Sequence, residues 1–227
     1  ELVVPLLPAV LGLLRSSGGA RFMYVSAEDD EDMVEMLSEL QHLDSHKRAT
    51  VPIYVSFVDK IIADEIEELV IPRLSYLEEK GNVKTDYFSK KIVNPNEVNN
   101  LFKNIDNEVL KYTSKTGMEI TKNIQFWIQD YSYKEAHGKH VHGSELLSGV
   151  YYIRAKNNPG NIRFYNPNPY PELYKYTIPI NNVLRYEVKP QKGMVILFPS
   201  WLSHEVLPSE NKNCIRTCLS FNYCKKI

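Results

Sequence analysis

Three of the chain's six histidines fall in one short segment, and another follows a hydrophobic run much later in the chain. His140 and His142 are separated by one residue, so in an extended segment both imidazoles lie on the same face. His204 comes after a hydrophobic run that ends in a Pro turn, which predicts a strand end or a loop mouth. A close pair on one strand and a distant His on another can form a facial metal site with open positions. We therefore predict a metal site of His140, His142 and His204.

The histidine pattern alone leaves alternatives open. An imidazole is a frequent metal ligand but more often a bystander, so the pair could also be a surface feature. His137 is expected to support a ligand from behind or to lie on the surface. Glu145 or Glu205 could supply a carboxylate ligand instead, although neither has the one-residue spacing that would place it beside a histidine.

A cationic residue near the C-terminus gives the second chemical signal. Arg216 shares one face of an expected strand with Cys218 and Ser220. If that face is inward, the buried guanidinium needs an anionic partner. The strand itself contains no acidic residue, so a small carboxylate ligand held in a bidentate fork is an attractive partner. The alternative is an ion pair with a distant Asp or Glu.

The elements that must position these residues are mainly strands. From about Glu119, runs of β-branched and aromatic residues alternate with turn residues. Several short strands at such spacing favour a sandwich or a jelly roll. The predicted strands are 123–133, 146–154, 161–165, 183–188, 193–198 and 215–223.

The part of the chain before this region is predicted to be helical. A short strand is expected over 51–57. Apolar residues at helical spacing predict a helix over 59–79, which Pro72 breaks or kinks, and a second helix over 96–113 with Asn96 as N-cap. We predict one domain over 51–227: mainly β, with flanking helices.

Residues 1–50 have no clear place in that domain. Residues 1–14 are apolar but shorter than a bilayer span and contain two prolines. Residues 15–19 look like a linker, and 33–40 have the spacing of an amphipathic helix. We interpret 1–50 as an arm or extension that is partly artificial or truncated, or that docks on the domain; insertion into a membrane is not expected.

Composition excludes some classes of function. The chain has 27 Lys and Arg residues and 28 Asp and Glu residues, so its net charge is −1. This balance excludes nucleic-acid binding that depends on a large overall positive charge. Hydrophobic residues make up 43% of the chain, enough for a core. Its three cysteines, Cys214, Cys218 and Cys224, form neither a disulfide framework nor a zinc knuckle. Free thiols favour a reducing compartment, and we predict a cytoplasmic protein.

Four segments together resemble the 2-oxoglutarate/Fe(II)-dependent oxygenase family of marine bacteria and phages. The resemblance covers roughly 126–223 and weakens toward residue 51. The segments that carry it are His140-x-His142, Ser148–Ile153 (SGVYYI), Gly193–His204 (GMVILFPSWLSH) and Arg216–Asn222 (RTCLSFN).

The resemblance implies a double-stranded β-helix, or jelly roll, with Fe(II) as cofactor and 2-oxoglutarate as co-substrate. It implies that His140, His142 and His204 hold the iron and that Arg216 binds the distal carboxylate of 2-oxoglutarate. Tyr131 or Tyr133 is a candidate for supporting the co-substrate. Ser220 is another candidate, because the Ser that often follows two residues after the Arg is replaced here by Cys218.

One departure matters for the chemistry. His142 stands where such enzymes usually have a carboxylate ligand, and a three-His site with an open position also suits zinc, so the metal can be iron or zinc. Trp201 and the segment 165–176 are expected either to line the substrate mouth or to pack at its rim.

The leading hypothesis is a dioxygenase that uses oxygen and 2-oxoglutarate to hydroxylate an unknown substrate. Two alternatives are a non-catalytic jelly-roll module for binding or assembly, and a three-His metal enzyme that does not use 2-oxoglutarate. The expected compartment is a bacterial or virus-infected host cytoplasm, and a homo-oligomer is an open alternative.

Overall fold

The computed structural model describes residues 21–26, 50–143, 145–167 and 185–225. Their strands form two sheets, of eight and four strands, that face each other across the core. In spatial order the large sheet contains β1 (Arg21–Ser26), β2 (Thr50–Phe57), β10 (Met194–Pro199), β7 (Glu145–Lys156), β12 (Ile215–Lys225), β5 (Ile120–Tyr131), β4 (Val83–Thr85) and β3 (Glu78–Lys80). The small sheet contains β6 (His137–His140), β11 (His204–Val206), β8 (Ile162–Tyr165) and β9 (Arg185–Val188).

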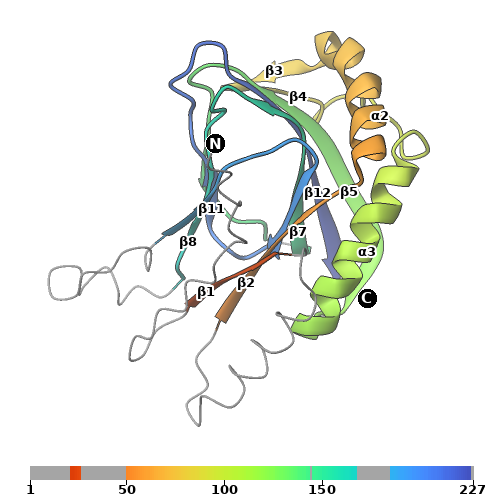
Figure 1. The fold of residues 1–227 in the computed structure, drawn as a ribbon, viewed down its shortest axis with the longest axis vertical. Helices are drawn as coiled ribbons and strands as arrows, with labels where there is room; N and C mark the ends of the chain where they lie inside the picture. Colours follow the sequence, from red (N-terminus) through yellow and green to blue (C-terminus); the bar gives the residue numbers. More distant parts are fainter. Residues whose placement is uncertain (1–20, 27–49, 144, 168–184, 226–227) are drawn as a thin grey trace, which may run out of the picture.

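Two helices cover the outer face of the large sheet (Figure 1). They are α2 (Lys60–Val70), which continues as a 3-10 helix η1 (Ile71–Tyr76), and α3 (Asn99–Thr116). Their apolar faces pack on the large sheet around Val70, Leu101 and Ile105, all fully buried. A second apolar cluster, which includes Phe164, Ile196 and Phe198, fills the space between the sheets.

The central strands are therefore covered on both faces. β10 is buried along its whole length, and β7 is buried over its central residues. Such strands are continuous hydrophobic runs rather than alternating ones. This explains why the segments SGVYYI and MVILFP have few charged residues.

The predicted helix over 59–79 is wrong in its second half. Asp59 accepts a hydrogen bond from the Ile61 N–H and caps α2. The α-helix ends at Val70, because Pro72 lacks an N–H to continue the ladder. A 3-10 helix follows, and residues 78–80 form β3, so Pro72 ends the helix rather than kinking it.

The predicted helix over 96–113 is displaced toward the C-terminus. The predicted cap, Asn96, is not the N-cap; α3 begins at Asn99, after Val98. Asn94 explains the difference, since its side chain accepts hydrogen bonds from the N–H groups of Asn96 and Glu97 and holds them in a turn. The helix then continues to Thr116 and ends at Gly117 in the left-handed region.

Each strand predicted from residue 51 onward has a counterpart, with shifted ends. β5 begins and ends earlier than the predicted 123–133, and β12 ends two residues later than the predicted 215–223. β3, β4, β6 and β11, all of four residues or fewer, are not among the predicted strand ranges.

Part of the range 1–50, assigned to an arm, contributes to the domain. Residues 21–26 form β1, which pairs in parallel with β2 at the edge of the large sheet. The predicted helix over 33–40 and residues 168–176 of the suggested substrate mouth lie outside the described residues. Among the described helices, none has the length and apolar character needed to cross a membrane.

Candidate metal centre and its cavity

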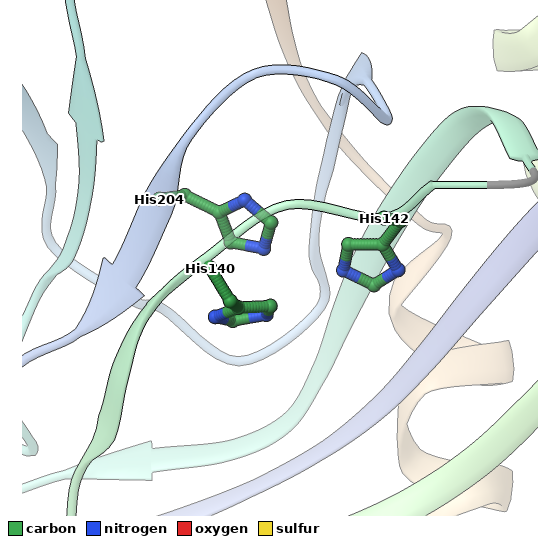
Figure 2. Close-up of side chains that lie close together, drawn as sticks. All are labelled: His140, His142 and His204. Carbon is green, nitrogen blue, oxygen red and sulfur yellow. The ribbon is translucent and has the colours of Figure 1, made fainter.

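The three predicted histidines come together between neighbouring segments (Figure 2). His140 ends β6 and His204 begins β11, and the two residues pair directly across these strands. His142 lies just past β6, where its backbone N–H donates to the Ser200 carbonyl at 2.9 Å. One side-chain nitrogen from each histidine lies within 4.8 Å of the others, a spacing at which a single ion could be held.

Local hydrogen bonds orient two of the imidazoles. The Nδ1 atom of His140 lies 2.8 Å from the Gly138 carbonyl, and Nδ1 of His204 lies 2.8 Å from the Leu202 carbonyl. A carbonyl can only accept, so each Nδ1 carries the proton. Each Nε2 therefore keeps a free lone pair, the form that binds a metal.

Burial keeps these imidazoles neutral. It lowers the pKa of His204 to about 3 and also lowers the pKa of His140 and of His142. At neutral pH a divalent cation would not have to displace protons from the three ligands.

No carboxylate of the described residues belongs to the histidine group. The Glu205 carboxylate accepts hydrogen bonds from Arg163 and from the Tyr165 hydroxyl. Glu145 lines the adjoining cavity without joining the group. The His137 ring stacks on the His140 ring, with centroids 4.1 Å apart, and is not one of the grouped residues.

The histidines line a cavity of about 670 Å³. Tyr131, Arg216 and Ser220, the residues predicted to bind a co-substrate, line the same cavity. Tyr133 and Trp201 are not among its lining residues, and the Trp201 side chain is 52% exposed.

Arg216 is buried at the cavity wall, and none of the described acidic residues is paired with it. Its side chain is 1% exposed. Its Nη1 donates to the carbonyls of Gly160 and Leu207, each at 3.1 Å, and Nη2 donates to the Glu135 carbonyl at 3.5 Å. The guanidinium lies 4.1 Å from the centre of the Tyr131 ring. No carboxylate of the described residues pairs with it, so this part of the chain does not provide the distant Asp or Glu of the alternative reading.

Two polar atoms at this end of the cavity have no hydrogen-bond partner among the described residues. They are Nε of Arg216 and the hydroxyl oxygen of Tyr131, and both are buried. Burial and the neighbouring Cys218 raise the pKa of Tyr131, so its hydroxyl stays protonated and can donate. An unpaired buried donor costs about 1–3 kcal/mol. A ligand that brings a hydrogen-bond acceptor to this end of the cavity would remove that cost.

A glycine makes room for the guanidinium. Gly160 has φ of +84°, in the left-handed region, and a Cβ there would lie 2.2 Å from the Leu207 carbonyl oxygen. The same Cβ would lie 3.0 Å from Nη1 of Arg216. Only glycine tolerates both the backbone conformation and this close approach.

Ser220 and Cys218 lie on the cavity side of β12, as the strand alternation predicts. The Ser220 hydroxyl already donates to the Gln129 side-chain oxygen at 2.8 Å. Burial raises the pKa of Cys218 to about 12, so its thiol is neutral. Neither residue adds a charge to the cavity.

Sequence reasoning missed several cavity residues. Trp127 and Gln129 alternate with Tyr131 along β5, so the period of two could have found them once Tyr131 was chosen. Tyr87 and Phe88 follow β4 in a segment without regular periodicity, and no local signal identifies them.

The comparison with family models matches part of the chain. Residues 125–222 match the family described as "Putative 2OG-Fe(II) oxygenase". This range contains all three histidines as well as Tyr131, Arg216 and Ser220. No curated protein matches the chain.

Solved structures of oxygenases share the fold. A prolyl-4-hydroxylase from Pseudomonas putida aligns with a TM-score of 0.57 at 13% identity, covering 75% of this chain and 90% of that one. A 2OG-Fe(II) oxygenase family oxidoreductase from Burkholderia pseudomallei aligns with a TM-score of 0.57 at 14% identity, covering 92% and 96%.

A third similar structure contains both a metal and a co-substrate. HygX from Streptomyces hygroscopicus, with nickel and 2-oxoglutarate bound, aligns with a TM-score of 0.53 at 11% identity, covering 78% of this chain and 84% of that one. At these identities the likeness concerns the fold, and the predicted double-stranded β-helix is confirmed.

Proposed function

We propose that the protein is a 2-oxoglutarate- and Fe(II)-dependent oxygenase that hydroxylates a substrate not yet identified. The observation that carries the proposal is Arg216, a buried guanidinium that has no acidic partner among the described residues and shares one cavity with three grouped histidines. The family match over 125–222 and the shared fold support it.

The residues present fit both groups that this chemistry needs. Three neutral imidazoles, two of them with Nε2 free, suit a divalent transition metal and leave coordination positions open. The unpaired Nε of Arg216 and the Tyr131 hydroxyl suit a carboxylate at the far end of a small dianion. In this assignment His140, His142 and His204 hold Fe(II), and Arg216 with Tyr131 holds 2-oxoglutarate.

Charge balance also fits. The metal group has no carboxylate, so a divalent ion on three neutral histidines keeps its charge of +2 until an anion arrives. 2-Oxoglutarate is a dianion, and together with Arg216 the site would favour it over neutral molecules of similar size. Ser220 is held by Gln129, so we assign it to the cavity wall.

When bound, Fe(II) supplies the redox chemistry in which 2-oxoglutarate, O₂ and R–H give succinate, CO₂ and R–OH. The chain's own residues orient and enclose these reactants. The hydrogen bonds at Nδ1 hold the rings of His140 and His204 in place. Arg216 and Tyr131 fix the far carboxylate, while Phe164 and Phe198 pack on His204 and exclude water behind it.

The test measures binding and turnover on the same samples. We expect the purified protein to bind Fe(II) without oxygen, to bind 2-oxoglutarate in the presence of metal, and to release succinate when oxygen is added. We expect Arg216→Gln to weaken 2-oxoglutarate binding at least ~100-fold while leaving the metal affinity near that of the wild type. Arg185→Gln, an exposed change in β9, is the matched control and is expected to bind both normally.

Absence of iron together with absence of 2-oxoglutarate binding would overturn the proposal. One observation favours a second candidate, a three-His metal enzyme that does not use 2-oxoglutarate: the histidine group contains no carboxylate. That candidate predicts metal binding and catalytic activity that Arg216→Gln leaves unchanged.

A further inference from the structure

The cavity has a second polar end, remote from Arg216. Along β12 the cavity-lining residues alternate from Arg216 through Cys218 and Ser220 to Asn222. At about 3.3 Å per residue, the six steps from Arg216 to Asn222 span about 20 Å. Asn222 therefore lies well beyond the reach of a molecule as short as 2-oxoglutarate anchored at Arg216.

Asn222 ends a chain of buried hydrogen bonds. The hydroxyl oxygens of Ser200 and Ser148 lie 2.8 Å apart, and Ser148 Oγ lies 2.8 Å from Oδ1 of Asn222. The three residues are at most 3% exposed. A chain of this kind can run in only one of two directions.

Counting hydrogens selects the direction. If Ser200 donates to Ser148 and Ser148 donates to Asn222, both hydroxyl hydrogens are used. In the opposite direction, the Ser200 hydroxyl would have no acceptor among the described residues, which is costly for a buried group. The Asn222 oxygen is thus an acceptor, which leaves its NH₂ group without a hydrogen-bond partner among the described residues, and Asn222 lines the cavity.

The same chain is tied to the metal centre. The Ser200 carbonyl accepts the His142 N–H at 2.9 Å, and the Ser200 N–H donates to the Leu146 carbonyl at 3.0 Å. The position of the Asn222 amide is therefore fixed relative to His142 through Ser200 and Ser148. A group bound by this amide would be held at a defined place with respect to the ion.

An aromatic wall, consisting of Tyr87, Phe88 and Trp127, lies at the His142 side of the cavity. Tyr87 contacts both other rings edge to face, with centroids 4.6 Å from Phe88 and 4.8 Å from Trp127. The Trp127 ring is nearly parallel to that of His142, at 6.5 Å. Tyr87 is 46% and Phe88 74% exposed, an exposure of adjacent large rings that is typical of binding sites.

Hydrogen bonds of the neighbouring residue Asp86 fix the backbone of this wall. Asp86, fully buried, accepts hydrogen bonds from the N–H groups of Ile92 and Ile128 at 2.9 and 2.8 Å. The exposed rings of Tyr87 and Phe88 therefore stand on a fixed backbone. Two ammonium groups lie nearby, since Lys91 approaches the Tyr87 ring at 5.7 Å and Lys80 lines the cavity. Both ammonium groups have acidic partners, since Lys91 lies 3.9 Å from Asp86 and Lys80 lies 3.5 Å from Glu78.

We propose that this end of the cavity binds the primary substrate, through an apolar ring on the aromatic wall and a carbonyl or carboxylate oxygen on the Asn222 amide. The inference rests on the proposed function only in naming the bound molecule as the substrate. It defines the substrate class: a molecule or residue in which an apolar ring adjoins a hydrogen-bond acceptor.

Three small probes test the two contacts separately. Acetophenone has a ring and a carbonyl, toluene has the ring alone, and acetone has the carbonyl alone. Their dissociation constants can be measured by saturation-transfer NMR on the full chain loaded with Zn(II), a diamagnetic substitute for iron. We expect acetophenone to bind at least about tenfold more tightly than either of the other two.

Variants assign each contact. We expect Asn222→Leu to weaken acetophenone binding at least about fivefold and to leave toluene binding unchanged, since the amide donor is lost and the aromatic wall is kept; this variant also removes the acceptor of the Ser148 hydroxyl. Asn222→Asp keeps the acceptor for Ser148 and removes the donor, so it tests the same contact with less disturbance. We expect Phe88→Ala, at an exposed position, to raise the dissociation constants of both acetophenone and toluene at least about threefold. Asn107→Leu on the solvent side of α3 is the matched control.

Equal acetophenone affinity in Asn222→Asp and in the Asn107→Leu control would overturn the inference, as would competition between acetophenone and 2-oxoglutarate. The proposed function fails separately. If Arg216→Gln leaves 2-oxoglutarate binding unchanged while the acetophenone results hold, the oxygenase assignment is wrong and the ring-and-acceptor site remains.

Discussion

The two sheets differ in the length of their strands, and the candidate site residues are divided between them. The large sheet has long central strands, β5, β7 and β12, and helices pack on its outer face. The small sheet has strands of three or four residues, and most of β6 is exposed. Yet His140 and His204 belong to the small sheet, whereas Tyr131 and Arg216 belong to the large one.

This difference indicates why Arg216 belongs to the large sheet and two of the histidines to the small one. Arg216 needs a deeply buried, rigid setting, because a guanidinium without an acidic partner is tolerated only where backbone carbonyls are held toward it. The histidines need free Nε2 atoms and access to a ligand, which short strands at the cavity rim provide. A bound ion would add a link between the paired strands β6 and β11 and stabilise the sheet that has the shorter strands.

Removing a ligand from the small sheet is expected to have the largest effect. We expect His204→Ala to weaken Zn(II) or anaerobic Fe(II) binding by more than ~100-fold, since supporting residues around metal ligands alone account for 10–100-fold. Calorimetric titration measures it. His137→Ala, which removes only the ring stacked on His140, is the control and should cost no more than about tenfold. A metal affinity equal to the wild type in His204→Ala would remove the small sheet from the metal site.

Overpacking the large sheet is expected to affect stability alone. A Cβ on Gly149 would lie 2.2 and 2.3 Å from two atoms of the Phe221 ring. We expect Gly149→Ala to lower the free energy of unfolding by about 2–3 kcal/mol. Urea denaturation measures this loss, and the metal affinity should stay within about twofold of the wild type.

The small sheet offers a matched substitution. A Cβ on Gly138 in β6 would meet no atom within 4 Å, so Gly138→Ala should leave the free energy of unfolding nearly unchanged. If Gly149→Ala and Gly138→Ala lowered the free energy of unfolding equally, the large sheet would not be packed more tightly than the small one at these positions.

A smaller effect is expected where the large sheet joins its helices. The Tyr223 hydroxyl of β12 donates to Asp106 of α3 at 2.6 Å. We expect Tyr223→Phe to cost about 1 kcal/mol in the free energy of unfolding, the usual net value of one hydrogen bond, without changing metal affinity. Tyr76→Phe, at a 74% exposed ring, provides the control. Equal melting temperatures for the two variants would show that the bond to α3 adds no stability.

The sequence was most informative where a pattern is local. Alternating and continuous apolar runs located β7, β10 and β12, and residue spacing brought out the histidines and Arg216. The four-residue segment HGKH gave no such signal, because β6 has no buried face of its own and is fixed only by pairing with β11.

Long-range contacts account for what the sequence could not predict. Ser148 and Asn222 are 74 residues apart, and their hydrogen bond depends on β7 and β12 being neighbours in a fixed register. Tyr87 and Phe88 line the cavity next to Asp86, whose carboxylate accepts the N–H groups of Ile92 and of the distant Ile128, a contact that no spacing rule reveals. The ends of α2 and α3 likewise followed from Pro72 and from the Asn94 turn.

The smallest expected effect lies at the surface of the helical layer. Arg73 of η1 donates to Glu97 ahead of α3 at 2.7 Å, and this bond, with the Asn94 N–H, lowers the pKa of Glu97 to about 2 from its usual 4.5. Since the folded pKa lies below the unfolded one, the pair contributes stability above about pH 4.5 and loses it as the pH falls toward about 2.

Comparing wild type with Glu97→Gln isolates this pair from the other carboxylates. Their difference in free energy of unfolding should be small at neutral pH, should shrink on acidification through that range, and should also shrink in high salt, because the pair is exposed to solvent. A difference that stays constant with pH would mean that Arg73 does not hold Glu97 in solution. Metal binding should be the same in both proteins at neutral pH, since the pair belongs to the layer that supports the large sheet and not to the sheet that carries the histidines.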